Sequence, residues 1–271
     1  MIQNTENGIV HYTFENLVAA EGINHLFSTR LGGVSQGAYD NMNLNFSMGD
    51  AHQAVMQNFQ RIAGLGFPVE DMVFSHQTHN CEIRQVTAAD RGKGIMCDRD
   101  YTGIDGLITN DPSVTLVTFY ADCVPLFFYD SMQGAIGLSH AGWRGTVGQI
   151  GVRTVAAMME SYGSTPSDIL VGIGPSICAS CFEVGNEVAE EFVHALDFAA
   201  DLIVPCDTKP DKSYIDLQGI NRQSLVNVGI PASNIEMPGI CTQENPDIFF
   251  SHRMMESARG SLAAFMRLHS A

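Results

Sequence analysis

The sequence has few basic residues. Lys and Arg together number 14 of 271, against 30 Asp and Glu, so the formal net charge is −16. A field of this sign repels phosphate backbones, and we therefore expect no nucleic-acid partner. Most of the acidic residues are expected on a solvated surface, so an anionic substrate would need a local basic pocket.

The sequence also lacks long hydrophobic runs. None of them approaches the roughly 20 residues that a membrane-spanning helix needs. The N-terminal stretch "MIQNTENGIVHYTF" has neither the basic start nor the apolar segment of a secretory signal. The seven cysteines are odd in number, and their spacing does not suggest a disulfide framework. These absences predict a cytoplasmic protein with no membrane partner and with mostly free thiols.

Two metal-binding signatures are missing. The chain has nine histidines but no His-x-His pair, the pattern of multicopper centres, so copper oxidase chemistry is a minor alternative. The His-x-Glu and Pro-Cys-x-x-Cys signature of zinc deaminases is also absent. Cys178 and Cys181 form a Cys-x-x-Cys. Because there is no second such pair, we expect two loop thiols there rather than a redox or zinc motif.

What the sequence does contain is a mixture of helix and strand patterns. Val55, Phe59 and Ile62 fall on one face of a helix expected over 51–66. Further helices are expected at 146–163, 186–196 and the end of 213–229. Short strands are expected within 71–86, 103–111, 114–130, 134–140, 167–185, 234–240 and 248–254, and 257–270 is ambiguous between helix and strand. Because strands and helices do not alternate regularly and no linker is visible, the sequence predicts one α+β domain over 1–271.

Four side chains stand out for their chemistry. His76, His79 and His140 lie in polar, turn-like contexts near strand ends, and Cys123 lies between two apolar strands. One thiolate and two imidazoles are the ligand set of a zinc site that keeps its fourth position open. The same atoms could form a cysteine nucleophile with a histidine base, or they could be ordinary polar residues. Spacing alone leaves these three interpretations open.

Two arginines are candidates for binding an anion. Arg30 lies in the Gly-rich stretch "FSTRLGGVS", where a guanidinium fork suits phosphate or carboxylate. Arg144 lies just before an expected helix start, where backbone N–H groups attract anions. The structural alternatives are a solvated surface position for Arg30 and packing against Trp143 for Arg144.

Several stretches, taken in order along the chain, resemble one family. They are "FSTRLGGVSQGAYDNMNLNFSMGD", "HQTHN", "DGLITN", "ADCVPLFFYD", "SHAGWRGT", "VGIGPSICASCFEVG" and "CTQENPDIFFSHR". The family is variously named multicopper polyphenol oxidase (laccase-like), purine nucleoside phosphorylase or peptidoglycan editing factor. The resemblance implies that His79, Cys123 and His140 bind one zinc ion. It also implies active-site roles for Arg30 and Asn43 beside Cys123, and it assigns no role to His76.

The resemblance carries further expectations about fold and activity. The implied fold has mixed β-sheets packed together with helices outside, similar to a bacterial cytotoxic deamidase toxin with a Cys–His active site. The implied activity is zinc-dependent phosphorolysis of adenosine, inosine, guanosine and methylthioadenosine, with deamination of adenosine. Separately from the resemblance, we expect a monomer. The alternatives are a cysteine hydrolase or amidase that uses Cys123 and His140 on a peptidoglycan precursor, a polyphenol oxidase, or a zinc-binding module without activity.

Overall fold

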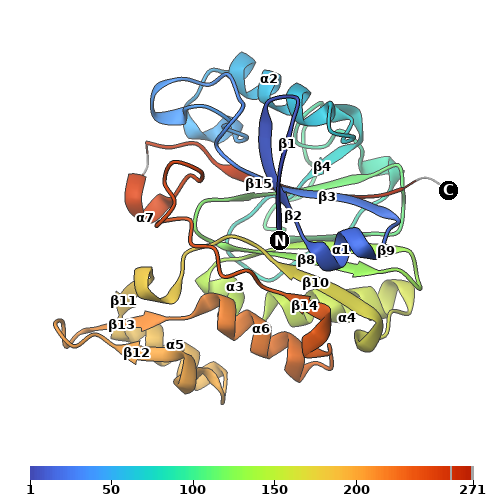
Figure 1. Ribbon diagram of the computed structural model, residues 1–271. Coiled ribbons are helices and arrows are strands. Elements are labelled where there is room, and N and C mark those ends of the chain that lie inside the picture. Colours follow the sequence, from blue (N-terminus) through green and yellow to red (C-terminus); the bar gives the residue numbers. More distant parts are fainter. Residues whose placement is uncertain (257, 270–271) are drawn as a thin grey trace.

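Two six-stranded mixed sheets packed face to face form the centre of the computed structural model, which describes residues 1–256 and 258–269 (Figure 1). Apolar side chains from both sheets fill the space between them, among them Phe27, Leu116, Phe127, Leu138 and Ala264. The expected α+β class, with mixed sheets packed together, is confirmed. Among the described residues, no helix has the length and apolar character needed to cross a bilayer.

The first sheet has the order β1-β2-β3-β15-β7-β4. Its neighbours pair antiparallel except at one edge, where β4 runs parallel to β7. In sheet order the strands are Ile2–Glu6, Ile9–Thr13, Ile23–Ser28, Leu262–Leu268, Thr115–Tyr120 and Met72–Phe74. The last strand of the chain, β15, therefore lies in the middle of this sheet. Residues 257 and 270, the ends of the ambiguous segment, lie outside the described residues.

The second sheet has the order β14-β10-β8-β9-β6-β5. Its central strands pair antiparallel, and each edge strand pairs parallel with its neighbour. In sheet order the strands are Ile235–Glu236, Ile169–Ile173, Val124–Asp130, Ala135–Ala141, Gly106–Thr109 and Ile83–Gln85. A separate small sheet consists of β11, β13 and β12, which are Glu183–Gly185, Lys212–Ile215 and Ile203–Pro205.

Helices cover the outer faces of both large sheets. Helix α2 (His52–Ala63) covers the first sheet, because Val55, Phe59 and Ile62 pack on its outer apolar face. The other helices are α1 (Glu15–Ala19), α3 (Trp143–Val147), α4 (Ile150–Tyr162), α5 (Asn186–Ala195), α6 (Leu217–Asn227) and α7 (His252–Met255). Figure 1 shows α2 at the top, and α3, α4 and α6 below the second sheet.

Two expected elements differ from the structure. The helix expected over 146–163 is two helices, α3 and α4, separated at Gln149, whose φ of 57° is left-handed and breaks the helical path. The strand expected over 248–254 is absent, and α7 occupies its second half. Phe249 and Phe250 are fully buried by packing into the core between the two large sheets, not by pairing in a sheet.

Candidate metal centre

Three of the side chains singled out in the sequence meet at one end of the second sheet. The ligand atoms of His79, Cys123 and His140 all lie within 4.8 Å of one another. Sγ of Cys123 is 3.9 Å from Nε2 of His79, and the two imidazole rings are 4.9 Å apart between centroids. His140 is buried, Cys123 is half-buried and His79 is exposed. The cluster is therefore accessible from solvent on the His79 side.

Antiparallel pairing brings these residues together. Cys123 directly precedes β8, and His140 lies near the end of β9, where it pairs with Pro125. His79 comes from the loop that leaves β4 in the first sheet and enters β5 in the second. His76, in the same loop, is not a member of the cluster. Its Nδ1 accepts a hydrogen bond from the N–H of Gly103, and its backbone forms a bridge with Ile104.

Gly142 is required by the close approach of the cluster. A Cβ at this position would lie 2.7 Å from Cδ2 of His79 and 3.2 Å from Sγ of Cys123. Any larger residue would push the thiol and the imidazole apart. Trp143 then opens α3, where it packs against the core beneath the second sheet, and the guanidinium of Arg144 stacks 4.1 Å over its ring.

Asp105, to which the sequence patterns assigned no role, organises two of the three side chains. This carboxylate is fully buried just before β6 and accepts a hydrogen bond of 2.9 Å from Nδ1 of His140. It also accepts the N–H groups of Thr78, His79 and Asn80 at 2.9–3.1 Å. These bonds hold the turn in which His79 has a left-handed φ of 63°. Because Nδ1 of His140 is engaged, Nε2 is the nitrogen left for the cluster.

The electrostatics of the cluster favour a thiolate. Burial opposes charge on Cys123, but His140 and His79 outweigh it and lower the pKa of the thiol to about 6. Burial likewise opposes charge on His140, but Cys123 and Asp105 raise the pKa of its imidazole to about 9. Without a metal, the two residues therefore form a thiolate–imidazolium pair at neutral pH. A divalent ion would take the place of the imidazolium proton.

Two cavities open onto the cluster. The first, of about 330 Å³, reaches His79, Cys123 and His140. Its polar wall includes Asn45, Gln77, Arg99, Arg259 and Ser261. The second, of about 460 Å³, reaches Cys123 and His79 and is lined by Trp143, Arg144, Ile177, Phe182 and Arg253. The cluster thus lies between a polar cavity and one with aromatic walls. The sequence patterns assigned no role to Arg99, Arg253 or Arg259. Arg253 ends the quoted stretch "CTQENPDIFFSHR", whereas Arg99 and Arg259 lie outside the quoted stretches.

Neither Arg30 nor Asn43 lines the polar cavity. The guanidinium of Arg30 donates 2.8 Å hydrogen bonds to the backbone carbonyls of Asp40 and Pro246, and it stacks over Phe250 at 4.7 Å. These contacts tie the Gly-rich loop to the 245–250 segment. The fully buried Asn43 accepts the N–H groups of Asn45 and Ser261, and so positions two residues of the cavity wall.

The fold and the cluster together define a class of protein: two mixed sheets with a Cys–His₂ group between two cavities. The chain belongs to the family described as multi-copper polyphenol oxidoreductase laccase, which matches residues 24–269. It is 38% identical over 250 residues to purine nucleoside phosphorylase YlmD of Bacillus subtilis, covering 90% of this chain and 88% of that one. It is 37% identical over 242 residues to adenosine deaminase RL5 of an unknown prokaryotic organism, covering 88% and 90%.

Solved structures agree with this assignment. YlmD from Geobacillus stearothermophilus superposes with a TM-score of 0.89 at 33% identity, covering 99% of this chain and 98% of that one. The Bacillus licheniformis protein YfiH superposes with a TM-score of 0.89 at 31% identity, covering 97% of both chains.

Although the family description names copper, the ligands present do not favour a multicopper centre. In the part of the chain that the structure describes, two groups of side chains have metal-binding geometry. Only His79 and His140 contribute imidazoles to them. A single group of two imidazoles and one thiol fits one divalent ion with an open position.

Proposed function

We propose that this protein is a zinc-dependent purine nucleoside phosphorylase that acts on adenosine, inosine, guanosine and methylthioadenosine, and that also deaminates adenosine to inosine. The observation that carries the proposal is the cluster of His79, Cys123 and His140 where a polar and an aromatic cavity meet. The relatives named purine nucleoside phosphorylase and adenosine deaminase, at 34–38% identity over most of the chain, support the same activity.

Zinc suits the donor set of this cluster. Cys123 supplies a thiolate, because its pKa is lowered to about 6, and two histidines supply imidazoles. Three protein ligands with one open position are the pattern of catalytic zinc. A bound zinc ion supplies Lewis acidity and a hydroxide at neutral pH, because it lowers the pKa of bound water to about 7.

The polar cavity is suited to phosphate. Nε of Arg259 is buried at its wall and has no hydrogen-bond partner among the described residues, while Nη1 donates to the carbonyl of Gly260. Burial lowers the pKa of both Arg259 and Arg99, which marks two cations held in a poorly solvated wall. Such cations bind an oxyanion strongly, because little water competes. We assign phosphate, the nucleophile of phosphorolysis, to this cavity.

The aromatic cavity is suited to the purine base. Trp143 and Phe182 line it with apolar surface, and Arg144 and Arg253 add polar groups at its wall. Flat aromatic walls suit a planar base, and a few polar groups fix its orientation. The ribose would then lie next to Cys123 and His79, between the base and the phosphate.

A second function is favoured by one specific observation. Cys123, His140 and Asp105 stand in the order nucleophile, base and orienting carboxylate, the arrangement of a cysteine hydrolase. Such an amidase would act on a peptidoglycan precursor, and its site would be like that of the Cys–His deamidase toxins. In this alternative the thiol attacks the substrate and no metal is needed.

Incubation with adenosine separates the possibilities. The purified protein, with and without phosphate, should give adenine and ribose 1-phosphate only when phosphate is present, and inosine in either case. Both activities should disappear after chelation and return with zinc. Cys97→Ser, which changes an exposed thiol outside the cluster, serves as the matched control. Turnover that persists in metal-free protein would contradict the zinc-dependent mechanism and favour the hydrolase.

A further inference from the structure

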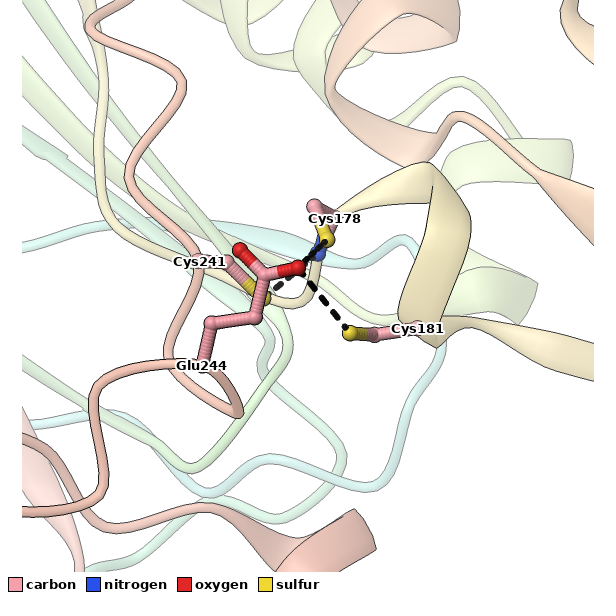
Figure 2. Close-up of side chains that lie close together, drawn as sticks. All are labelled: Cys178, Cys181, Cys241 and Glu244. Carbon is pink, nitrogen blue, oxygen red and sulfur yellow. Dashed lines mark hydrogen bonds between the residues drawn. The ribbon is translucent and has the colours of Figure 1, made fainter.

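A second group of potential ligands lies away from the cluster described above. The ligand atoms of Cys178, Cys181, Cys241 and Glu244 all lie within 4.8 Å of one another. Figure 2 shows the three sulfur atoms and the carboxylate converging on one point. Cys178 directly precedes a single 3₁₀ turn, Ala179–Cys181, and Cys181 is the last residue of this turn. Cys241 and Glu244 come from the loop after β14.

The distances within this group match a tetrahedral ion. Oε1 of Glu244 is 3.7 Å from Sγ of Cys178 and 3.7 Å from Sγ of Cys181. A zinc–sulfur bond of about 2.3 Å and a zinc–oxygen bond of about 2.0–2.2 Å in a tetrahedron place the oxygen about 3.6 Å from the sulfur. The N–H of Cys178 also donates a hydrogen bond of 3.3 Å to Sγ of Cys241.

The backbone holds the two loops in this arrangement before any ion binds. Ser176 and Cys241 form a parallel bridge, through hydrogen bonds from the N–H of Ser176 to the carbonyl of Ile240 and from the N–H of Thr242 to the carbonyl of Ser176. Cys241 is 3% exposed. The ligands therefore come from a fixed framework and need little rearrangement.

The group has no compensating positive charge of its own. Within residues 1–256 and 258–269, no lysine, arginine or histidine lies within ion-pair distance of Glu244. The nearby guanidinium of Arg253 instead donates to the backbone carbonyls of Cys181 and Glu183. Three thiols and a carboxylate facing each other form the donor set that attracts a soft divalent ion.

We propose that Cys178, Cys181, Cys241 and Glu244 bind a second zinc ion, which has a structural role. Four protein ligands fill the tetrahedron and leave no position for substrate, unlike the group of His79, Cys123 and His140. A disulfide between two of the cysteines is the competing chemistry. It would leave the third sulfur and the carboxylate of Glu244 facing each other without a partner.

The second ion would steady the turn that presents Cys123. Asp122, its neighbour, has a left-handed φ of 83° and is held by both loops of the proposed site. Its carbonyl accepts the N–H of Ile177 at 2.9 Å, and its carboxylate accepts the hydroxyl of Thr242 at 2.6 Å. Joining the two loops therefore fixes Asp122, and with it the position of the thiol in the first cluster.

Counting zinc in the full-length protein tests this proposal, independently of nucleoside chemistry. Elemental analysis should find about two zinc ions per chain in the wild type and about one in His140→Ala, which loses only the first site. Cys181→Ser should also contain about one. The control Cys97→Ser should match the wild type, because this thiol belongs to neither group. Equal zinc in Cys181→Ser and the wild type, or zinc-free His140→Ala, would overturn the proposal.

Two measurements keep the test decisive if Cys181→Ser fails to fold. Glu244→Gln changes an exposed side chain. From one of its two sites, this variant should release zinc to a chelator roughly 10-fold faster than the wild type does. Cobalt-loaded His140→Ala should show the intense near-ultraviolet absorption of several thiolates on a tetrahedral ion. The second site would be overturned if Glu244→Gln released zinc at the wild-type rate or if cobalt-loaded His140→Ala lacked the thiolate absorption. A disulfide among these cysteines in protein purified without reductant would overturn it as well.

Discussion

Oδ1 of Asp105 lies 2.9 Å from Nδ1 of His140, and the same carboxylate accepts the backbone N–H groups on either side of His79 and that of His79 itself. One buried carboxylate thus orients one histidine ligand through its ring and the other through its backbone. This relationship connects β6, β9 and the loop after β4. It means that the geometry of the metal centre depends on a residue that touches neither the proposed ion nor a cavity.

Asp105→Asn should weaken the metal centre without unfolding the protein. The amide keeps the volume of the carboxylate, but it removes the charge and replaces one accepting oxygen with a donor. We expect zinc affinity at the first site to fall roughly 10–100-fold. Zinc competition with a chelator, and kcat/KM at fixed free zinc, would measure the loss. An unchanged zinc affinity would show that Asp105 does not position the ligands.

His140→Ala should abolish phosphorolysis and deamination together while the fold survives. The backbone of His140 is held by its pairing with Pro125 and by its N–H bond to the carbonyl of Asp105, neither of which needs the side chain. Zinc content, melting temperature and both rates should be measured on one preparation. His194→Ala, an exposed change on α5, is the control. Loss of only one activity would reject a single site for both reactions.

Cys123 should react as a thiolate in metal-free protein well below the pH at which an ordinary thiol does. Although burial opposes the charge, His140 and His79 lower the pKa of the thiol from 9.0 to about 6. Iodoacetamide alkylation, followed by mass spectrometry against pH, should therefore have its midpoint near pH 6. In His140→Ala the midpoint should move toward 9.0. Zinc should suppress the reaction, and rapid alkylation of zinc-loaded protein would argue that Cys123 is not a ligand.

Arg259→Ala should raise the KM for phosphate at least about tenfold while zinc content stays constant, because this half-buried guanidinium can bind an oxyanion by charge-assisted hydrogen bonds. Arg30→Ala should act differently. It removes one exposed and one half-buried hydrogen bond to backbone carbonyls and a stack on Phe250, and we expect a loss of about 1 kcal/mol of stability. Steady-state kinetics and urea unfolding of both variants separate these effects. A larger phosphate defect in Arg30→Ala would assign the anion site to the Gly-rich loop.

His25 should make the protein less stable in mild acid. Burial, and then the charge of His11, lower the pKa of His25 from 6.5 to about 4, and Nε2 accepts the N–H of Phe14 in the neutral form. As pH falls from 6.5 to 4 the unfolded chain takes up a proton that the folded chain excludes, so stability is lost over this window, by up to about 3 kcal/mol. Urea unfolding against pH should show a shallower loss in His25→Gln, which retains an acceptor. If the wild type and His25→Gln lose stability in parallel as the pH falls, this prediction is wrong.

Local patterns in the sequence predicted most of the elements that build the two sheets. The spacing of Val55, Phe59 and Ile62 specifies a helix with one apolar face, and α2 buries these three side chains. The strand predicted over 248–254 was wrong for a physical reason. A segment can be apolar because its side chains are buried, whether or not its backbone pairs in a sheet. Phe249 and Phe250 are buried in this way, without sheet partners. The same limitation applies at Gln149, where a single left-handed residue divides an otherwise continuous helical pattern.

The identity of the reactive side chains was determined by the sequence, because a thiol and two imidazoles carry their chemistry wherever they lie. Family motifs indicated which of them belong together, and the structure brings His79, Cys123 and His140 within reach of one ion. Tertiary structure alone decided which residues, distant in the sequence, surround and orient these side chains. Asp105 meets His140 across 35 positions of the chain, and Cys181 meets Glu244 across 63. Partners so far apart leave no periodic signal, since only the pairing of strands and loops in space sets their distance.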